Sequence, residues 1–235
     1  MPSRPDLRSR IALLVPSTFL IDGPVCRLAE EVGLQPCLLR VPSPTIADTS
    51  DAGAVADMVR FMGDTESLAA AARLAREVEP NVIAWGCTSG SFIDGGQMGK
   101  RQAAAMEAAA GVPAITTSQA MISALSDIGA RRIVVITPYL VPIGERFVEF
   151  LEGAGLTVTS EAHLGAGSDA EVGALTASVF ADALDALPAD QVDAIVIPCT
   201  AVDEYRIRPA LAASDAPIIF ANRATLECAA QCARR

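Results

Sequence analysis

The sequence predicts an α/β fold of two similar lobes, each with a parallel sheet flanked by helices. Two observations support this prediction. Short aliphatic or β-branched runs alternate with longer helical patterns, and motifs from the first half of the 235-residue chain recur in order in the second half. Strands that alternate with helices pair in parallel, because a parallel partner needs a long crossover connection. The length fits one large domain or two small lobes.

Eight strands and nine helices are expected along the chain. Each strand is a short apolar run, and they cover 11–15, 37–41, 82–85, 114–116, 133–137, 157–159, 194–197 and 218–220. The expected helices cover 25–32, 52–60, 65–79, 100–109, 118–128, 143–154, 170–186, 207–213 and 224–233. Thr65 and Ser118 are the expected N-cap residues, because their hydroxyls can accept from free backbone N–H groups.

Four matches in the same order indicate a duplicated lobe. Residues 10–16 match 132–138, residues 33–34 match 155–156, residues 82–88 match 194–200, and residues 112–116 match 216–220. We therefore expect an N-terminal lobe over 1–117, which a helix at 222–235 can complete, and a C-terminal lobe over 118–221.

Ligands of such lobes bind outside the carboxyl ends of the strands. Pro16, Cys87, Pro138 and Cys199 each come just after a predicted strand. If the two lobes face each other through these ends, the two Cys-Thr turns become opposite walls of one cleft.

Charge and composition exclude several classes of protein. A net charge of −10 argues against a nucleic-acid partner, because such binding depends on Lys and Arg. Lys100 is the single lysine and leaves little room for Schiff-base or pyridoxal chemistry. No Walker loop or dinucleotide-binding glycine motif follows a predicted strand. We therefore expect neither a cofactor nor a metal.

The chain is expected to be cytoplasmic, without a membrane partner. No apolar run is long enough to span a bilayer, and residues 1–10 lead into a strand without the pattern of an export signal. The six cysteines are interpreted as reduced thiols, since a chain of this size needs no disulfide frame. A homo-oligomer is left open.

Cys87 and Cys199 are the candidate catalytic residues. Each lies in a Cys-Thr turn, and the first turn, Gly86-Cys87-Thr88-Ser89, is rich in hydroxyl and N–H donors that suit a carboxylate. We expect these donors to favour the thiolate and lower the thiol pKa. Two thiols on opposite faces of one carbon can invert it, or one thiolate can add to a double bond and leave after rotation. Neither route needs a cofactor.

The remaining cysteines are interpreted as packing residues, because a free cysteine is more often buried than reactive. They are Cys26, Cys37, Cys228 and Cys232. The helical spacing of Cys228 and Cys232 does not make a metal site without further ligands. His163 is the single histidine, and nothing in the sequence pairs it with a thiol, which weakens a Cys-His hydrolase.

Several strand-end residues are candidate substrate ligands. Tyr139 can donate its hydroxyl to a carboxylate, or pack as a ring between the lobes. Ser17 and Thr18 follow Pro16 at the position that Tyr139 has in the second lobe, and they can bind substrate or cap the next helix.

Together these motifs resemble the aspartate/glutamate racemase superfamily, in the branch that contains maleate cis-trans isomerase and arylmalonate decarboxylase. The resemblance covers nearly the whole chain and depends on the order and spacing of short motifs. They are Val15-Pro16-Ser17-Thr18, Gly86-Cys87-Thr88-Ser89, Thr137-Pro138-Tyr139 with Glu145-Arg146, residues 165–173, and Pro198-Cys199-Thr200.

The resemblance implies two four-stranded lobes related by a pseudo-twofold axis, with the active site in the cleft between them. It implies that Cys87 attacks a cis double bond and that Cys199 exchanges or guides the proton. The expected substrate-binding residues are Pro16, Ser17, Thr18, Thr88, Ser89, Tyr139 and Thr200. The decarboxylase has glycine at the position of Cys87, so two thiols favour an isomerase or racemase of a small carboxylate or dicarboxylate.

Two departures from the pattern bear on the substrate. Phe19 stands where the isomerase has an asparagine, and Asp169 stands where it has a second one. A buried aspartate repels a carboxylate, so we expect a monocarboxylate, an amino acid, or a dicarboxylate with an apolar substituent near Phe19. The alternatives are an arylmalonate-type decarboxylase with Cys199 as proton donor, an amino-acid or hydantoin racemase, and a non-catalytic binding protein.

Overall fold

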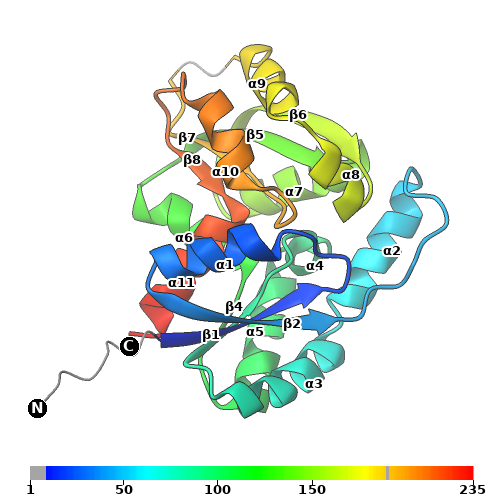
Figure 1. The fold of residues 1–235 in the computed structure, drawn as a ribbon. Helices are drawn as coiled ribbons and strands as arrows, with labels where there is room; N and C mark the ends of the chain where they lie inside the picture. Colours follow the sequence, from blue (N-terminus) through cyan, green and yellow to red (C-terminus); the bar gives the residue numbers. More distant parts are fainter. Residues whose placement is uncertain (1–8, 189–190, 235) are drawn as a thin grey trace, which may run out of the picture.

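The computed structural model describes residues 9–188 and 191–234, which form two four-stranded parallel sheets (Figure 1). The first sheet has the order β2-β1-β3-β4, and the second repeats it as β6-β5-β7-β8. The strands are β1 Ser9–Pro16, β2 Leu34–Val41, β3 Val82–Trp85, β4 Ala114–Thr116, β5 Arg132–Tyr139, β6 Thr157–Ala166, β7 Ala194–Ile197 and β8 Ile218–Phe220. All eight predicted strands are present, and the prediction of two similar α/β lobes is confirmed.

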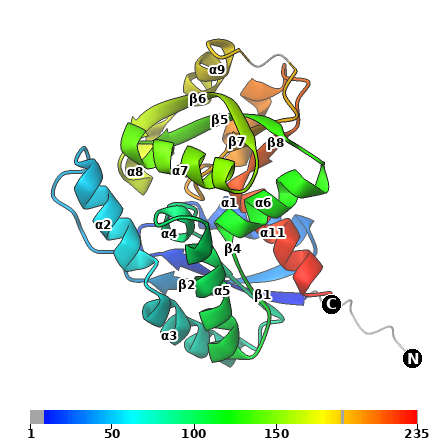
Figure 2. The ribbon, with the colours of Figure 1, turned by 180° about the vertical axis from the view of Figure 1, so that it is seen from behind.

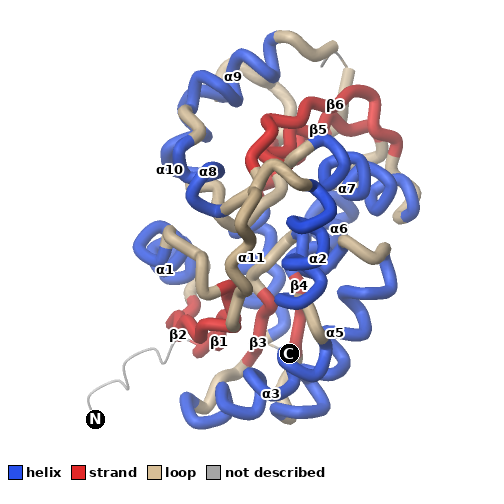
Figure 3. Tube along the Cα trace, turned by 90° about the vertical axis from the view of Figure 1, so that its right-hand side faces the viewer, coloured by secondary structure: helices blue, strands red, loops and turns tan. Residues whose placement is uncertain are grey.

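Helices pack around both sheets (Figures 2 and 3). They are α1 Asp22–Glu31, α2 Ala52–Met62, α3 Thr65–Ala75, α4 Ser89–Phe92, α5 Gly96–Ala110, α6 Thr117–Asp127, α7 Val141–Gly153, α8 Asp169–Ala174, α9 Ala177–Asp185, α10 Glu204–Ile207 and α11 Ala221–Cys232, with 3-10 turns at Arg76–Val78 and Arg208–Leu211. The central strands β1 and β5 are buried over most of their length. Burial on both faces explains why they are continuous apolar runs rather than alternating ones.

The duplication extends to the turns between elements. After α1 and after α7 the chain passes through a glycine with left-handed backbone, Gly33 at φ 86° and Gly155 at φ 87°. Glycine adopts this conformation without the steric cost that a Cβ brings. The repeat of these glycines in the sequence therefore marks one turn, used twice, that leads the chain into the edge strands β2 and β6.

The single helix predicted for 170–186 is wrong, because the chain forms two helices there. The backbone is extended at Leu175 and Thr176, which separates α8 from α9. The Thr176 hydroxyl lies 2.8 Å from that of Ser178. Such local hydroxyl contacts compete with helix formation, which makes this position a helix start rather than a helix interior.

Both predicted N-cap residues are also wrong. Asp64 caps α3, since its carboxylate accepts from the N–H of Ser67, and Thr65 is the first helical residue. Ser118 lies inside α6, where its hydroxyl donates 3.0 Å to the carbonyl of Ser91. Its hydroxyl therefore connects α6 to the helix α4, which the sequence did not predict.

Helix α11 follows the last strand of the second sheet but packs against the first lobe. It contacts α6, β3 and β4, and Leu226 and Ala229 share an apolar cluster with Ile11 of β1. Because α6 belongs to the expected second lobe, the completion of the first lobe by 222–235 and the lobe boundary at residue 117 both stay predictions.

No helix within 9–188 and 191–234 is long and apolar enough to cross a lipid bilayer. The expectation about an export signal falls mainly on residues 1–8, which lie outside the described residues.

Candidate active site

The two Cys-Thr turns contact each other across the lobes. They follow β3 and β7, and the hydroxyl of Thr88 accepts a 3.2 Å hydrogen bond from the backbone N–H of Cys199. The hydroxyl of Thr200 donates a 3.0 Å hydrogen bond to the carbonyl of Gly86. Thr88 and Thr200 are equivalent in the repeat, so each turn is held by the threonine of the other.

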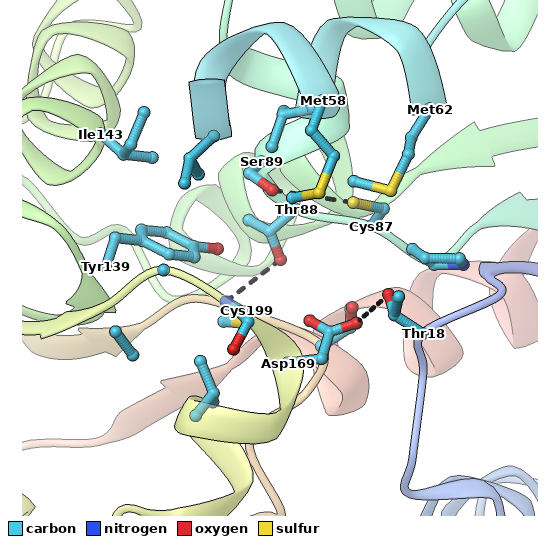
Figure 4. A pocket seen from close by; sticks show the side chains of 18 residues that line it. Thr18, Met58, Met62, Cys87, Thr88, Ser89, Tyr139, Ile143, Asp169 and Cys199 are labelled. Atoms are coloured by element: carbon cyan, nitrogen blue, oxygen red, sulfur yellow. Dashed lines mark hydrogen bonds between the residues drawn. The ribbon is translucent and has the colours of Figure 1, made fainter. Parts of the chain in front are cut away.

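A cavity of about 80 Å³ lies between these turns, and Cys87 and Cys199 both line it (Figure 4). One part of its wall is polar and is formed by Thr18, Cys87, Thr88, Ser89, Tyr139, Ser168, Asp169, Cys199 and Thr200. The other part is apolar and is formed mainly by Val55, Met58, Val59, Met62, Ile143 and Val172. Residues of both lobes thus enclose one small space that contains both thiols.

The Cys87 sulfur lies beside hydrogen-bond donors at the start of α4. The backbone N–H of Gly90 points to Sγ at 3.4 Å, and the hydroxyl of Ser89 lies 3.7 Å from it. Donors around a sulfur stabilise its thiolate form. These donors favour the thiolate of Cys87, as the N–H of Ala201 and the hydroxyl of Tyr139 do for Cys199.

Cys199 has a backbone conformation that is rare for a residue with a side chain. Its φ is 80°, in the left-handed region. Such a conformation costs on the order of 1–3 kcal/mol and persists where the surrounding structure imposes it. The hydrogen bond from its N–H to Thr88 is one such restraint. The fold thus holds this thiol at the cavity against a local backbone preference.

The expected lowering of the thiol pKa is wrong. Burial raises the pKa of Cys87 to about 12; the Gly90 N–H and the Ser89 hydroxyl oppose this, and the charge of Asp169 adds to it. Burial, followed by Asp169, also raises the pKa of Cys199. Loss of water outweighs the donors of the turns. Among the described residues, no Lys, Arg or His lines the cavity to compensate.

Tyr139 has a buried hydroxyl that hydrogen-bonds to nothing within the described part of the chain. Figure 4 shows the ring pointing its oxygen toward Thr88 and Cys199. Burial, and then the nearby Cys199 and Cys87, raise the pKa of this phenol well above its usual value. A buried hydroxyl without a partner destabilises the folded protein. A ligand in the cavity can remove this cost by accepting a hydrogen bond from Tyr139.

Six of the seven predicted substrate-binding residues line the cavity: Pro16, Thr18, Thr88, Ser89, Tyr139 and Thr200. Ser17 does not. Its hydroxyl accepts a 3.0 Å hydrogen bond from the backbone N–H of Ser43, outside the cavity. The roles of these residues and of the two cysteines remain predictions, but their placement in one cavity is a finding.

The apolar substituent expected near Phe19 is not supported, because Phe19 does not line the cavity. Its side chain is 3% exposed and packs with the core of the first lobe. The Phe19 N–H bonds the carbonyl of Pro16 at 3.0 Å, and this turn separates the ring from Thr18. The apolar wall comes instead from α2, α7 and α8, which sequence reasoning missed.

The other singled-out side chains lie elsewhere. None of Cys26, Cys37, Cys228 and Cys232 lines the cavity, and nor does His163. The His163 ring lies 3.0 Å from the Thr137 hydroxyl and 3.2 Å from Glu161. Within the described ranges, no group of three His, Cys, Asp or Glu side chains could hold a metal ion.

The chain is similar in sequence to members of a known family. The arylmalonate decarboxylase family profile matches residues 55–233. The maleate isomerase of Nocardia farcinica is 30% identical over 128 residues, which is 52% of this chain and 51% of the relative. The chain thus matches about half the length of that curated relative.

Solved structures share the fold over nearly the whole chain. A variant of the Nocardia farcinica maleate cis-trans isomerase with a covalently bound succinylcysteine intermediate superposes with a TM-score of 0.79 and 20% identity, covering 93% of this chain and 89% of that one. Arylmalonate decarboxylase superposes with a TM-score of 0.71 and 22% identity, covering 95% and 92%. The profile match extends over most of the sequence, and the chain belongs to the arylmalonate decarboxylase family.

Proposed function

We propose that this chain is a cofactor-independent isomerase of a small carboxylate that works through Cys87 and Cys199. The observation that carries the proposal is that both thiols line one small cavity between the lobes. The relatedness to maleate isomerases supports a cis-trans isomerisation. Cytoplasmic location and a homo-oligomer stay predictions.

In the proposed reaction the Cys87 thiolate adds to one carbon of a cis double bond and forms a C–S bond. The π-electron pair moves to the neighbouring carbon, which takes the proton of the Cys199 thiol. The resulting C–C single bond rotates. The Cys199 thiolate then takes a proton back, the double bond forms again in the trans geometry, and the C–S bond breaks. Atoms and electrons balance without a cofactor.

The substrate carboxylate binds, in this proposal, at the donors beside the thiols. The hydroxyls of Tyr139, Thr88 and Ser89 line that part of the cavity. A carboxylate oxygen there satisfies the unpaired hydroxyl of Tyr139. Such donors also stabilise the charge that develops on the carboxylate when the adjacent carbon gains electrons.

Racemisation of an amino acid or hydantoin is an alternative for the same pair of thiols. One thiolate removes a proton from a carbon while the other thiol delivers a proton to the opposite face. The placement of Cys87 and Cys199 in one cavity is compatible with both isomerisation and racemisation. Only the identity of the substrate distinguishes the two reactions.

Decarboxylation of a substituted malonate is the second candidate function. The apolar wall that α2 contributes, with Met58 and Met62, favours a substrate with an apolar substituent. This reaction needs one proton donor, Cys199, and does not need Cys87. Carbon dioxide release that survives Cys87→Gly would select it.

The test is proton NMR in deuterated buffer with maleate, maleamate, aspartate, glutamate, hydantoins and 2-substituted malonates. We expect one of these to be isomerised or racemised, and Cys87→Ser and Cys199→Ser each to lower kcat by about 10²–10⁴-fold. Circular dichroism of both variants checks that they fold. Full activity in either variant would refute the two-thiol proposal.

A further inference from the structure

Asp169 brings a carboxylate into the cavity from the second lobe. It is the first residue of α8, and it lines the cavity together with both cysteines. Its Oδ2 accepts a 2.7 Å hydrogen bond from the hydroxyl of Thr18, which comes from the first lobe. Within 9–188 and 191–234, Thr18 is its one side-chain hydrogen-bond partner, which leaves Oδ1 able to accept from a ligand.

Among the described residues that line the cavity, no Lys, Arg or His balances this carboxylate. In a partly buried site two like charges repel more strongly than in water, because the effective dielectric constant is lower. While Asp169 is ionised, a second carboxylate of a substrate has no favourable partner beside it; burial raises the pKa of Asp169, and the hydrogen bond from Thr18 opposes this.

The polar groups of the cavity are arranged asymmetrically. Figure 4 shows Tyr139 and Asp169 on opposite sides of Cys199. The side with Tyr139 offers hydroxyl donors, including one that is buried and unpaired. The side with Asp169 offers an acceptor. The Thr18 hydroxyl beside it already donates its hydrogen to Oδ2 of Asp169, so it is not a free donor. A ligand that spans the two thiols thus meets donors at one end and an acceptor at the other.

We infer that the substrate carries a carboxylate at one end and a hydrogen-bond donor, an amide or an ammonium group, at the other, and that Asp169 selects for this donor. The inference rests on the proposed function in that it takes this cavity as the substrate site. Asp169 is then a specificity-determining residue rather than part of the proton transfer. A plain dicarboxylate is the substrate that it disfavours.

The test measures binding of unreactive ligands of similar length by isothermal titration calorimetry. Succinate carries two carboxylates, succinamate carries one carboxylate and an amide, and 4-aminobutyrate carries one carboxylate and an ammonium group. We expect the wild-type chain to bind succinamate or 4-aminobutyrate at least about tenfold more tightly than succinate, because like charges oppose the succinate complex. The two donor ligands separate amide from ammonium recognition.

Asp169→Asn should reverse this preference, since an asparagine amide can donate to a second carboxylate. Asp182→Asn is the matched control: it removes one negative charge from the exposed surface of α9, outside the cavity, and should leave the preference unchanged. Equal or tighter binding of succinate to the wild-type chain would overturn the inference. So would an unchanged preference in Asp169→Asn, or no binding of any of the three ligands.

The binding experiment tests the inference about Asp169, and the turnover assay tests the proposed function, so either can be refuted while the other stands. A donor preference that depends on Asp169 stands even if the NMR assay finds no thiol-dependent turnover, which would refute the proposed function alone. Thiol-dependent isomerisation of maleate, with succinate bound most tightly, would refute the inference about Asp169 alone.

Discussion

Cys87 and Cys199 are related by the repeat, yet their surroundings differ in a way that suits different roles. The sulfur of Cys87 receives the N–H of Gly90, whereas Cys199 uses its own N–H to reach Thr88 and has a left-handed backbone. These differences agree with the proposal that Cys87 adds to the double bond and Cys199 carries the proton, although the N–H of Ala201 and the hydroxyl of Tyr139 also favour a negative sulfur at Cys199.

The raised pKa of Cys87 predicts an alkaline pH dependence. Only the thiolate adds to a double bond, and below the pKa its fraction rises tenfold with each pH unit. Since burial raises that pKa to about 12, kcat/KM should keep rising from pH 7 to pH 10, beyond the usual thiol pKa of about 8.5.

The check is kcat/KM as a function of pH, together with the rate of Cys87 alkylation by iodoacetamide. A plateau of both quantities below pH 8 would contradict the burial of the thiol in the free protein. The alkylation of an exposed model thiol over the same range serves as the control.

At the residue scale, sequence reasoning located the thiols and most of the polar wall but misjudged their chemistry. Cys87 and Thr200 follow apolar runs that recur in the chain, and that pattern is local. The thiol pKa depends on how completely other segments exclude water, which no local pattern contains. Phe19 adjoins a cavity residue in sequence, but a turn separates the two side chains.

At the scale of elements, the two Cys-Thr turns act as one unit. Thr200 donates to the carbonyl of Gly86, and Thr88 accepts from the N–H of Cys199. Both threonines are buried, so a lost partner is not replaced by bulk water. The relative position of the two thiols therefore depends on these two hydroxyls.

Thr200→Val should destabilise the chain by about 1–3 kcal/mol, because it removes a buried donor and leaves the Gly86 carbonyl unpaired. It should also reduce kcat more than it changes KM, since the thiols lose their relative placement. Urea denaturation and steady-state kinetics measure the two effects.

Thr200→Ser is the matched control, because it keeps the hydroxyl and loses only a methyl group. It should retain most of the stability and activity that Thr200→Val loses. Equal losses in the two variants would mean that packing of the methyl group matters and that the hydrogen bond does not.

The apolar wall shows which elements the sequence could not place. Helix α2 was predicted as a helix, but nothing in its pattern distinguishes the face with Met58 from a face that packs on its own sheet. Helix α8 was predicted only as part of a longer helix, and the expectation that Asp169 meets the substrate came from the resemblance to a family rather than from the helix pattern. Side chains of both helices line the cavity only because of how the helices pack in the folded chain.

At the scale of the whole molecule, duplication explains why so much of the architecture could be predicted. Strands of a buried parallel sheet are recognisable runs, and a repeat fixes the order of the second sheet once the first is assigned. The structure shows that order twice. The way in which the lobes face each other came from the resemblance to a family, since no run of residues within one lobe specifies it.

The proposed reaction requires that Cys87 and Cys199 act on the same bound molecule. Peptide mass spectrometry of the Cys199→Ser variant, quenched with the unsaturated substrate that the NMR assay identifies, tests this requirement. In this variant water can still protonate the carbanion and fix the adduct, whereas no thiolate is present to remove that proton again, so we expect an adduct of one substrate molecule on Cys87. An adduct on Cys26, Cys37, Cys228 or Cys232 instead, or no adduct in a variant that still binds the substrate, would contradict it.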